Sequence, residues 1–229
     1  MTGPKGRAVV VEILGLPGSG KTTITRELSR RDAHVLTMHR YRSWGNVGAY
    51  VMAAVRLVPG IVTAARHGAS SRDVRRLIRL ASSDAVLRRL RRRRAVGAVV
   101  LDQGPVFLLR QISASPRSSV EPIPRYRSRY LHLYADLLDL VVVLDASDDV
   151  LLARTREREK HHRLRDMSEA DARHELEAER RSMEATLSEL TDAGAAGVRV
   201  VDTGTASVDD TVVTVVRCIE AVGASRPQV

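Results

Sequence analysis

The stretch from Gly15 to Thr22 constrains this chain more than any other, because it reads Gly-Leu-Pro-Gly-Ser-Gly-Lys-Thr. This is the complete G-x-x-x-x-G-K-[ST] pattern of a phosphate-binding loop. Mostly apolar residues precede it at 8–14 and predict a buried strand, while residues 22–30 are typical of the first turns of a helix. Strand, glycine-rich turn and helix form the setting that the pattern requires. The chain is therefore predicted to bind the phosphates of a nucleoside triphosphate.

Each residue type in this phosphate loop has a chemical reason. The glycines let the backbone bend with its amides inward, where those amides and the positive end of the following helix hold phosphate oxygens. Lys21 supplies a charge to the β- and γ-phosphates, and the Thr22 hydroxyl can ligate Mg²⁺. Only three of the 37 lysines and arginines in the chain are lysines, so Lys21 is not a generic positive charge. The residues predicted to contact the nucleotide are Gly15, Pro17, Gly18, Ser19, Gly20, Lys21, Thr22 and Thr23.

Length and composition favour one α/β domain over residues 1–229, with 44% hydrophobic residues to build its core. No charged-then-apolar leader precedes the first predicted strand, and no apolar stretch is long enough for a membrane span. The single cysteine, Cys218, cannot form a disulfide within the chain. These features predict a cytoplasmic protein with no membrane partner.

Strand and helix patterns alternate along the whole chain. Most of the apolar runs lack a polar alternation, as expected for strands that are covered on both faces of a parallel sheet. Helical patterns lie between them, and Pro59-Gly60 is expected to divide the helical region between the second and third strands. The patterns predict an α/β fold with a five-stranded parallel sheet and helices on both faces. The predicted strands lie at 8–14, 34–38, 97–102, 139–145 and 198–201.

Two acidic residues stand out in the predicted strands. Asp102 ends a buried strand, where it would lie beside the phosphate loop and hold the Mg²⁺ shell or accept the proton of an attacking hydroxyl. The alternative is an aspartate that caps the following helix, and the phosphate loop favours the functional interpretation. Glu12 lies inside the first strand, where we expect it to be buried and paired with Arg40 or Arg42.

The segment 154–165 is dense in cations. Phosphoryl transfer spreads negative charge over the moving oxygens, so an arginine that closes over them lowers the barrier. Arg154 and Arg158 are four residues apart and share a helix face, while Arg163 follows the helical run, where a lid would lie. We expect a lid near 154–168, with these three arginines acting on the transferring phosphoryl group.

The net charge of +10 has two interpretations. One is a surface for nucleic acid, centred on the basic helical stretch at 72–94. The other is a solvated helix face on a phosphate-handling enzyme. Aromatic residues make up only 3% of the chain and few are interleaved with the arginines, so base stacking on this stretch is disfavoured. The solvated face is the favoured interpretation.

Together these residues resemble the nucleoside and nucleotide kinase group of P-loop proteins, above all its thymidylate-kinase-like members and the small-molecule phosphotransferases related to them. Residues 15–23 match the phosphate loop of that group, Asp102 stands where the group carries an Asp-Arg pair, and residues 135–146 are similar to its fourth strand. The resemblance implies a P-loop kinase fold with the phosphate-loop strand in the centre and ATP and Mg²⁺ as cofactors. It also implies that Asp202 lies near the adenine.

The sequence departs from that group at two positions. Leu14 stands where the group has an acidic residue, and Gln103 replaces the arginine after Asp102, so thymidylate is disfavoured as a substrate. The favoured function is an ATP-dependent kinase that transfers the γ-phosphoryl group to a hydroxyl or phosphate of a small molecule. A nucleoside-like, nucleotide-like or antibiotic-like acceptor fits this function. The expected catalytic residues are Lys21, Asp102, Arg154, Arg158 and Arg163, and the expected metal ligands are Thr22 and Asp102.

Two other functions compete with this one. The first is a nucleic-acid-associated P-loop ATPase that uses the 72–94 helix, although nucleic acid is not the favoured partner. The second is a P-loop protein that binds nucleotide without turnover, or a transferase for a sulfonated nucleotide. The favoured partner is a small-molecule phosphoryl acceptor, and the sequence leaves a homodimer open.

Overall fold

The computed structural model describes residues 7–32, 34–39, 47–91, 97–115, 119–157, 162–195 and 197–225. Within these residues, five parallel strands form one sheet in the order β2-β3-β1-β4-β5. The strand that precedes the phosphate loop is therefore central, as the resemblance implied. The five strands are β1 (Val9–Gly15), β2 (Val35–His39), β3 (Ala98–Asp102), β4 (Leu140–Asp145) and β5 (Val198–Asp202).

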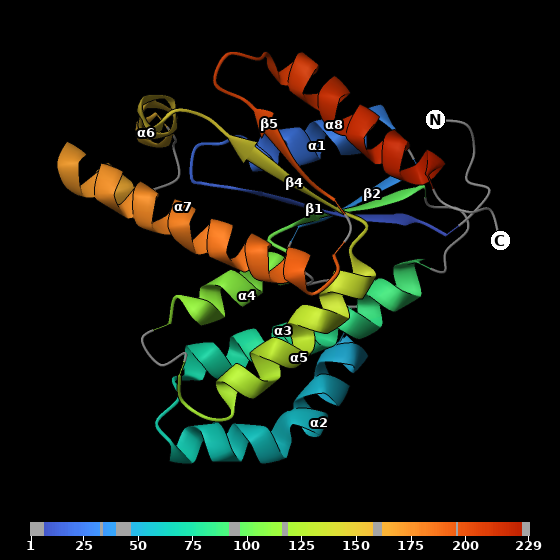
Figure 1. Cartoon of the computed structure of the whole chain (residues 1–229), viewed down its shortest axis with the longest axis vertical. Helices are drawn as coiled ribbons and strands as arrows, with labels where there is room; N and C mark the ends of the chain where they lie inside the picture. Colours follow the sequence, from blue (N-terminus) through green and yellow to red (C-terminus); the bar gives the residue numbers. More distant parts are fainter. Residues whose placement is uncertain are drawn as a thin grey trace.

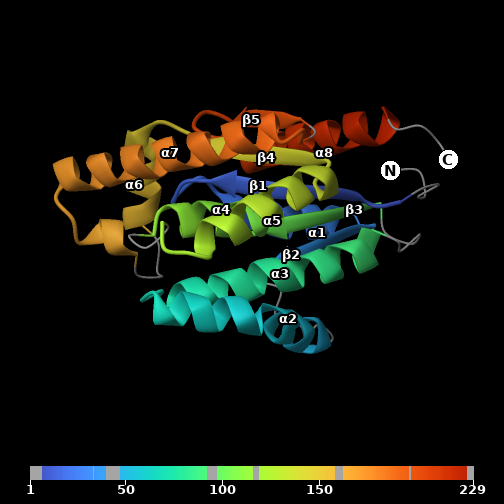
Figure 2. The ribbon, with the colours of Figure 1, turned by 60° about the horizontal axis from the view of Figure 1, so that its bottom comes forward.

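Helices cover both faces of the sheet. Figure 1 shows α1 and α8 on one face and α3, α4, α5 and α7 on the other. Figure 2 shows α2 on the outside of this second group, where it packs along α3. The helices are α1 (Lys21–Arg31), α2 (Val47–Arg66), α3 (Ser71–Arg91), α4 (Pro105–Ser113), α5 (Ile123–Leu137), α6 (Asp148–Arg156), the 3-10 turn η2 (Arg163–Arg165), α7 (Glu169–Asp192) and α8 (Val208–Ala224).

The central strand explains why the predicted strands lack alternation. Val9, Val11 and Ile13 pack toward α1 and α8, while Val10 and Leu14 pack into the larger cluster with α3 to α7. Both sides of β1 are buried, so apolar residues are favoured at every position. The fold confirms the predicted α/β class, and the predicted strand bounds agree with the observed ones to within one residue.

The expected break at Pro59-Gly60 is wrong, because α2 continues through both residues to Arg66. Gly60 lies against α5, where an added Cβ would come within 2.4 Å of the Tyr126 ring. The glycine thus permits a close helix contact, and packing of α2 offsets the backbone hydrogen bond that proline removes. The chain turns instead near Gly68, which has a φ of +83°. Among the described helices, none is both long and apolar enough to cross a membrane.

Candidate functional site

The phosphate loop joins β1 to α1 and is closely packed on two sides. Gly15 has a φ of +151° and Gly18 a φ of +86°, which a glycine adopts without steric cost. A Cβ on Gly15 would lie 2.4 Å from both the Leu144 carbonyl oxygen and Ser19 Oγ. A Cβ on Gly18 would lie 2.4 Å from the Leu151 carbonyl oxygen of α6. The loop therefore holds its shape between β4 and α6 only with glycine at both positions.

The start of α1 offers the features that hold phosphate. Its cap residue is Gly20, and within the fully described α1 no side chain caps the helix start and no acidic residue occupies the first turn. The positive end of the helix dipole thus faces the loop. Lys21 Nζ donates to the carbonyl oxygens of Gly15 and Leu16 at 2.7 and 2.8 Å, so the ammonium group lies over the loop. This cradle fits a triphosphate, and Thr22 at its rim is only partly buried.

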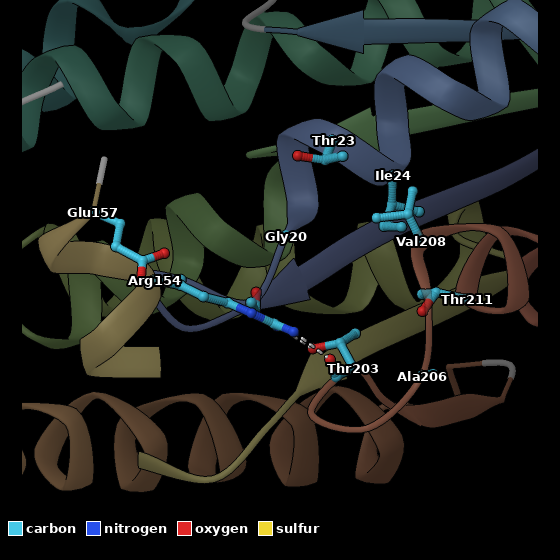
Figure 3. Close-up of a pocket in the computed structure, with 11 residues that line it drawn as sticks. Gly20, Thr23, Ile24, Arg154, Glu157, Thr203, Ala206, Val208 and Thr211 are labelled. Carbon is cyan, nitrogen blue, oxygen red and sulfur yellow. Dashed lines mark hydrogen bonds between the residues drawn. The ribbon is translucent and has the colours of Figure 1, made fainter. Parts of the chain in front are cut away.

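A cavity of about 330 Å³ opens beside the phosphate loop, and we call it the loop cavity. Figure 3 shows Arg154 of α6 extending across it toward Thr203, in the segment after β5. Arg154 Nη2 donates to the Thr203 carbonyl oxygen at 2.8 Å. The cavity thus joins the loop to α1, α6 and α8. Residues that line it include Gly18, Gly20, Thr23, Arg154, Thr203 and Thr211.

Asp102 lies where the sequence predicted it, at the end of β3 beside the phosphate-loop strand. It is buried and in register with Ile13, two residues before Gly15. Helix α1 also contacts β3, so the start of α1 and Asp102 belong to the same edge of the sheet. Gln103 follows with a φ of +60°, an unfavourable conformation for a residue with a side chain. The turn after Asp102 is therefore held in a strained shape by its surroundings.

Among the described residues, the partners of Glu12 are backbone N–H groups and not an arginine. Glu12 Oε2 accepts the backbone N–H of Val106, and Oε1 accepts that of Phe107, each at 2.9 Å. Burial raises the pKa of Glu12 to about 8, although the N–H groups that face it act in the opposite direction. Arg40 and Arg42 lie outside the described residues. A strand pattern cannot identify partners so far away in the sequence.

A second cavity, of about 800 Å³, lies between α3, α4, α7 and η2, and we call it the helix cavity. Arg76 of α3 donates to Gln111 of α4 at 3.3 Å. Arg110 of α4 forms a 3.4 Å ion pair with Glu179 of α7. Most of the arginines that line this cavity thus have partners of their own, and its walls are polar and of mixed charge.

Asp73 places an ionised carboxylate in the wall of the helix cavity. Its burial would raise the pKa, but hydrogen bonds from Ser70, Ser115 and Arg76 outweigh burial and lower the pKa below the ordinary value. Asp73 therefore carries its charge at neutral pH and holds Arg76 and Ser115 in place at this wall.

The arginines predicted to form one lid occupy two different places. Arg154 lines the loop cavity, whereas Arg163 pairs with Glu175 and lines the helix cavity. Helix α6 ends at Arg156, and Arg158 lies outside the described residues. The described part of the expected lid segment thus contributes one arginine to each cavity.

Asp202 is not among the residues that line the loop cavity. Its Oδ1 accepts the Gly204 N–H at 2.7 Å and its Oδ2 accepts the Thr205 hydroxyl at 3.2 Å, so it shapes the turn after β5. The neighbouring Thr203 reaches the cavity instead. The sequence reasoning also missed Arg110 and the role of Glu12. The position of Arg110 on the helix after Asp102 was the only signal for it.

Comparisons with known proteins agree with this geometry. The sequence model of a family described as an AAA domain matches residues 10–186. A search of the curated proteins finds no match. Among solved structures, deoxyadenosine kinase from M. mycoides, with dCMP and a flexible dCDP bound, aligns with a TM-score of 0.54 and 14% identity over 93% of this chain and 100% of that one.

Two further structures are similar. The same deoxyadenosine kinase with bound dATP has a TM-score of 0.52 and 14% identity, over 92% of this chain and 98% of that one. Thymidylate kinase from Candida albicans has a TM-score of 0.52 and 17% identity, over 94% of this chain and 92% of that one. At these identities the likeness shows the fold alone, which is that of the P-loop kinases.

Because its pKa is raised in the folded protein, Glu12 should make the free energy of unfolding decrease as the pH rises. The folded protein keeps the proton to about pH 8, while the unfolded chain releases it near the ordinary value of 4.5. This contribution is fully present below the unfolded pKa and is lost as the pH rises through the folded pKa, by on the order of a few kcal/mol at most. Urea unfolding at several pH values should show the loss in the wild type and not in Glu12→Gln. Parallel pH profiles of the two proteins would contradict it.

Proposed function

The chain belongs to the AAA domain family that its sequence matches over residues 10–186, and we propose that it is an ATP-dependent small-molecule kinase. It transfers the γ-phosphoryl group to a hydroxyl or phosphate of an acceptor that is nucleoside-like, nucleotide-like or antibiotic-like. The observation that carries this proposal is a complete phosphate loop with a cavity beside it for a nucleotide and a larger polar cavity across α4 for an acceptor. The kinases of similar fold support the same reaction class.

ATP would occupy the phosphate loop and the loop cavity. Lys21 and the first amides of α1 hold the phosphates, while Arg154 and Thr203 flank the rest of the nucleotide. This placement changes the role expected for Arg154, because its guanidinium group is turned to the segment after β5. It acts on the bound nucleotide and not on the phosphoryl group in transit.

The acceptor would occupy the helix cavity. Arg110 and Gln111 of α4 present donors and acceptors to it, and the ionised Asp73 of α3 holds Arg76 beside them. Arg163, from the expected lid, borders the same cavity and is mostly exposed, so it is available to the transferring group. A set of mixed charges suits a small polar molecule with several hydroxyl or amino groups.

In the transfer step, an acceptor oxygen bonds to the γ-phosphorus while the bond from that phosphorus to the β,γ-bridging oxygen breaks, and ADP leaves. When the acceptor is a hydroxyl, Asp102 takes its proton. Lys21 offsets the charge that develops on the leaving oxygen. Thr22 and Asp102 would hold Mg²⁺, which neutralises the phosphate charge when bound.

The alternative function, a nucleic-acid-associated ATPase, gains no support from the basic helix. Arg76 lines the helix cavity and pairs with Asp73, and Arg91 pairs with Asp139. These arginines are engaged within the molecule.

The first test is transfer from labelled ATP to a panel of nucleosides, nucleotides and aminoglycoside-like compounds. The wild type should label at least one class. Lys21→Ala should lose about 100-fold or more in rate, because it removes the positive charge that stabilises the negative charge on the leaving oxygen. Asp102→Asn should keep ATP binding and lose about 100-fold in transfer to a hydroxyl. A wild type that binds no ATP and labels nothing refutes the proposal.

The two cavities predict opposite kinetic effects. Arg154→Ala should raise the KM for ATP by about tenfold, since it removes a charged hydrogen-bond donor, and should leave the KM for the acceptor unchanged. Arg110→Ala should raise the KM for the acceptor and leave the KM for ATP unchanged. Steady-state kinetics with each substrate varied will distinguish them, and Arg181→Ala, on the exposed side of α7, serves as control. If both variants raise the same KM, the assignment of the cavities is wrong.

We also propose that the chain forms a homodimer through α2. Side chains at 51, 55, 58 and 62 follow the alternating spacing of four and three that lines a helix-packing seam. They are about half exposed, and Arg56 is the only charged residue between 47 and 65. A two-fold axis would pack this face against the same face of a second copy. Because the face is apolar, the contact brings no like charges together, although each chain has a net charge of +10. The apolar face comprises Val51, Met52, Val55, Val58 and Val62.

Sedimentation of the wild type should therefore give a dimer at micromolar concentration. Val55→Asp should give a folded monomer, because the carboxylate would be buried in the seam without a partner. Val213→Asp, at an exposed valine of α8, is the matched control and should stay dimeric. A monomeric wild type, or equal dissociation by both variants, would contradict the α2 interface.

A further inference from the structure

Glu12 is a fully buried carboxyl group on the central strand, three residues before the phosphate loop begins. Its oxygens accept the N–H groups of Val106 and Phe107 at the start of α4. Pro105 is the first residue of α4 and has no N–H, so these are the first two donors that the helix offers. Gly104 precedes the helix and has no side chain to cap it. Glu12 therefore caps α4 from another element of the fold.

The turn between β3 and α4 is shaped around this carboxyl group. A Cβ on Gly104 would lie 2.7 Å from Cδ and 2.8 Å from Oε2 of Glu12, so only glycine fits there. Gln103 keeps its unfavourable φ of +60° in the same turn. Residues in such conformations persist only where the surroundings over-determine them. The two hydrogen bonds from α4 to Glu12 supply that constraint and fix the turn against β1.

Helix α4 carries this constraint to the wall of the helix cavity. One turn beyond the capped end, Arg110 pairs with Glu179 of α7 and Gln111 accepts a hydrogen bond from Arg76 of α3. A displacement of the capped end would move both side chains together because the helix is rigid. Glu12 itself sits on the strand that enters the phosphate loop. Glu12 thus links the strand of the phosphate loop to the helix that carries Arg110 and Gln111.

We propose that Glu12 is a positioning residue that fixes the wall of the acceptor cavity relative to the phosphate loop. The inference rests on the proposed kinase function. Phosphoryl transfer depends on placing the acceptor oxygen in line with the γ-phosphorus, and a displacement of about 1 Å can cost on the order of 100-fold in rate. Glu12 does not touch the substrates. It sets the separation between the phosphate loop and the α4 side chains of the acceptor cavity, which do touch them.

The test compares three variants for ATP affinity, unfolding and the rate of transfer. The variants are compared above about pH 8, where Glu12 is ionised and both of its oxygens accept a helix N–H. Glu12→Gln keeps the size of the side chain but turns an NH₂ group toward one of these two donors. Its affinity for ATP should stay within about threefold of the wild type, since the loop is unchanged, while kcat should fall by about 10- to 100-fold. Gly104→Ala displaces the same turn from the opposite side and should reproduce this effect on kcat.

Asp139→Asn is the matched control. Asp139 is also a buried carboxylate that accepts a β1 backbone N–H, that of Val10 at 2.7 Å, but at the opposite end of the strand. Its replacement should lower stability and leave kcat unchanged. A full kcat in Glu12→Gln, or equal losses of kcat in Glu12→Gln and Asp139→Asn, would overturn the positioning role.

Amide hydrogen exchange separates this inference from the proposed function. In the wild type, the amides of Val106 and Phe107 should exchange more slowly than amides at an uncapped helix start. In Glu12→Gln the same two amides should exchange at least about tenfold faster than in the wild type. If the wild type transfers phosphoryl to no compound, the proposed function fails and this measurement alone decides what Glu12 does. Fast exchange in the wild type would show that Glu12 does not hold α4, whether or not the Glu12→Gln variant folds.

Discussion

The close approach of β4 and α6 to the phosphate-loop glycines is the constraint on which both cavities depend. Gly15 lies against the Leu144 carbonyl group and Gly18 against the Leu151 carbonyl group, and neither position has room for a side chain. Helix α6 can therefore pack directly onto the loop, which brings Arg154 across the loop cavity. The chain then continues through η2 into α7 and forms a wall of the helix cavity. One packing arrangement thus sets the shape of both cavities.

Charge within the site is balanced more closely than the net charge of +10 suggests. In the helix cavity, Arg76 pairs with Asp73 and Arg110 with Glu179. Paired groups of this kind offer directed hydrogen bonds and little net attraction for a polyanion. This arrangement favours a small polar acceptor, because specificity would come from the geometry of donors and acceptors along α3, α4 and α7.

The parts of the site that follow from local pattern could be predicted from the sequence. Lys21 and Asp102 were placed correctly because each ends or begins an element whose apolar pattern is clear. Arg154 and Arg163 could not be assigned to separate cavities, since their places depend on how α6 and η2 turn in space. Asp202 was expected near the nucleotide; it bonds its own turn and does not line the loop cavity, whereas the neighbouring Thr203 does.

Long-range contacts mark the limit of such prediction. Glu12 reaches Val106 across 94 residues, and no periodicity or motif records a contact of that kind. Burial identified Glu12 as unusual, because a carboxyl group inside a central strand requires donors. The identity of those donors depends on β3 lying beside β1, which places the start of α4 next to that strand.

A crystal structure with Mg²⁺ and a non-hydrolysable ATP analogue would test the central claim most directly. The triphosphate should lie along residues 15–22, with the base in the loop cavity against Arg154 and Thr203. The γ-phosphate should face Asp102 and the helix cavity, which stays open for the acceptor. A base bound in the helix cavity, or a γ-phosphate turned away from that cavity, would contradict the assignment of a donor and an acceptor site.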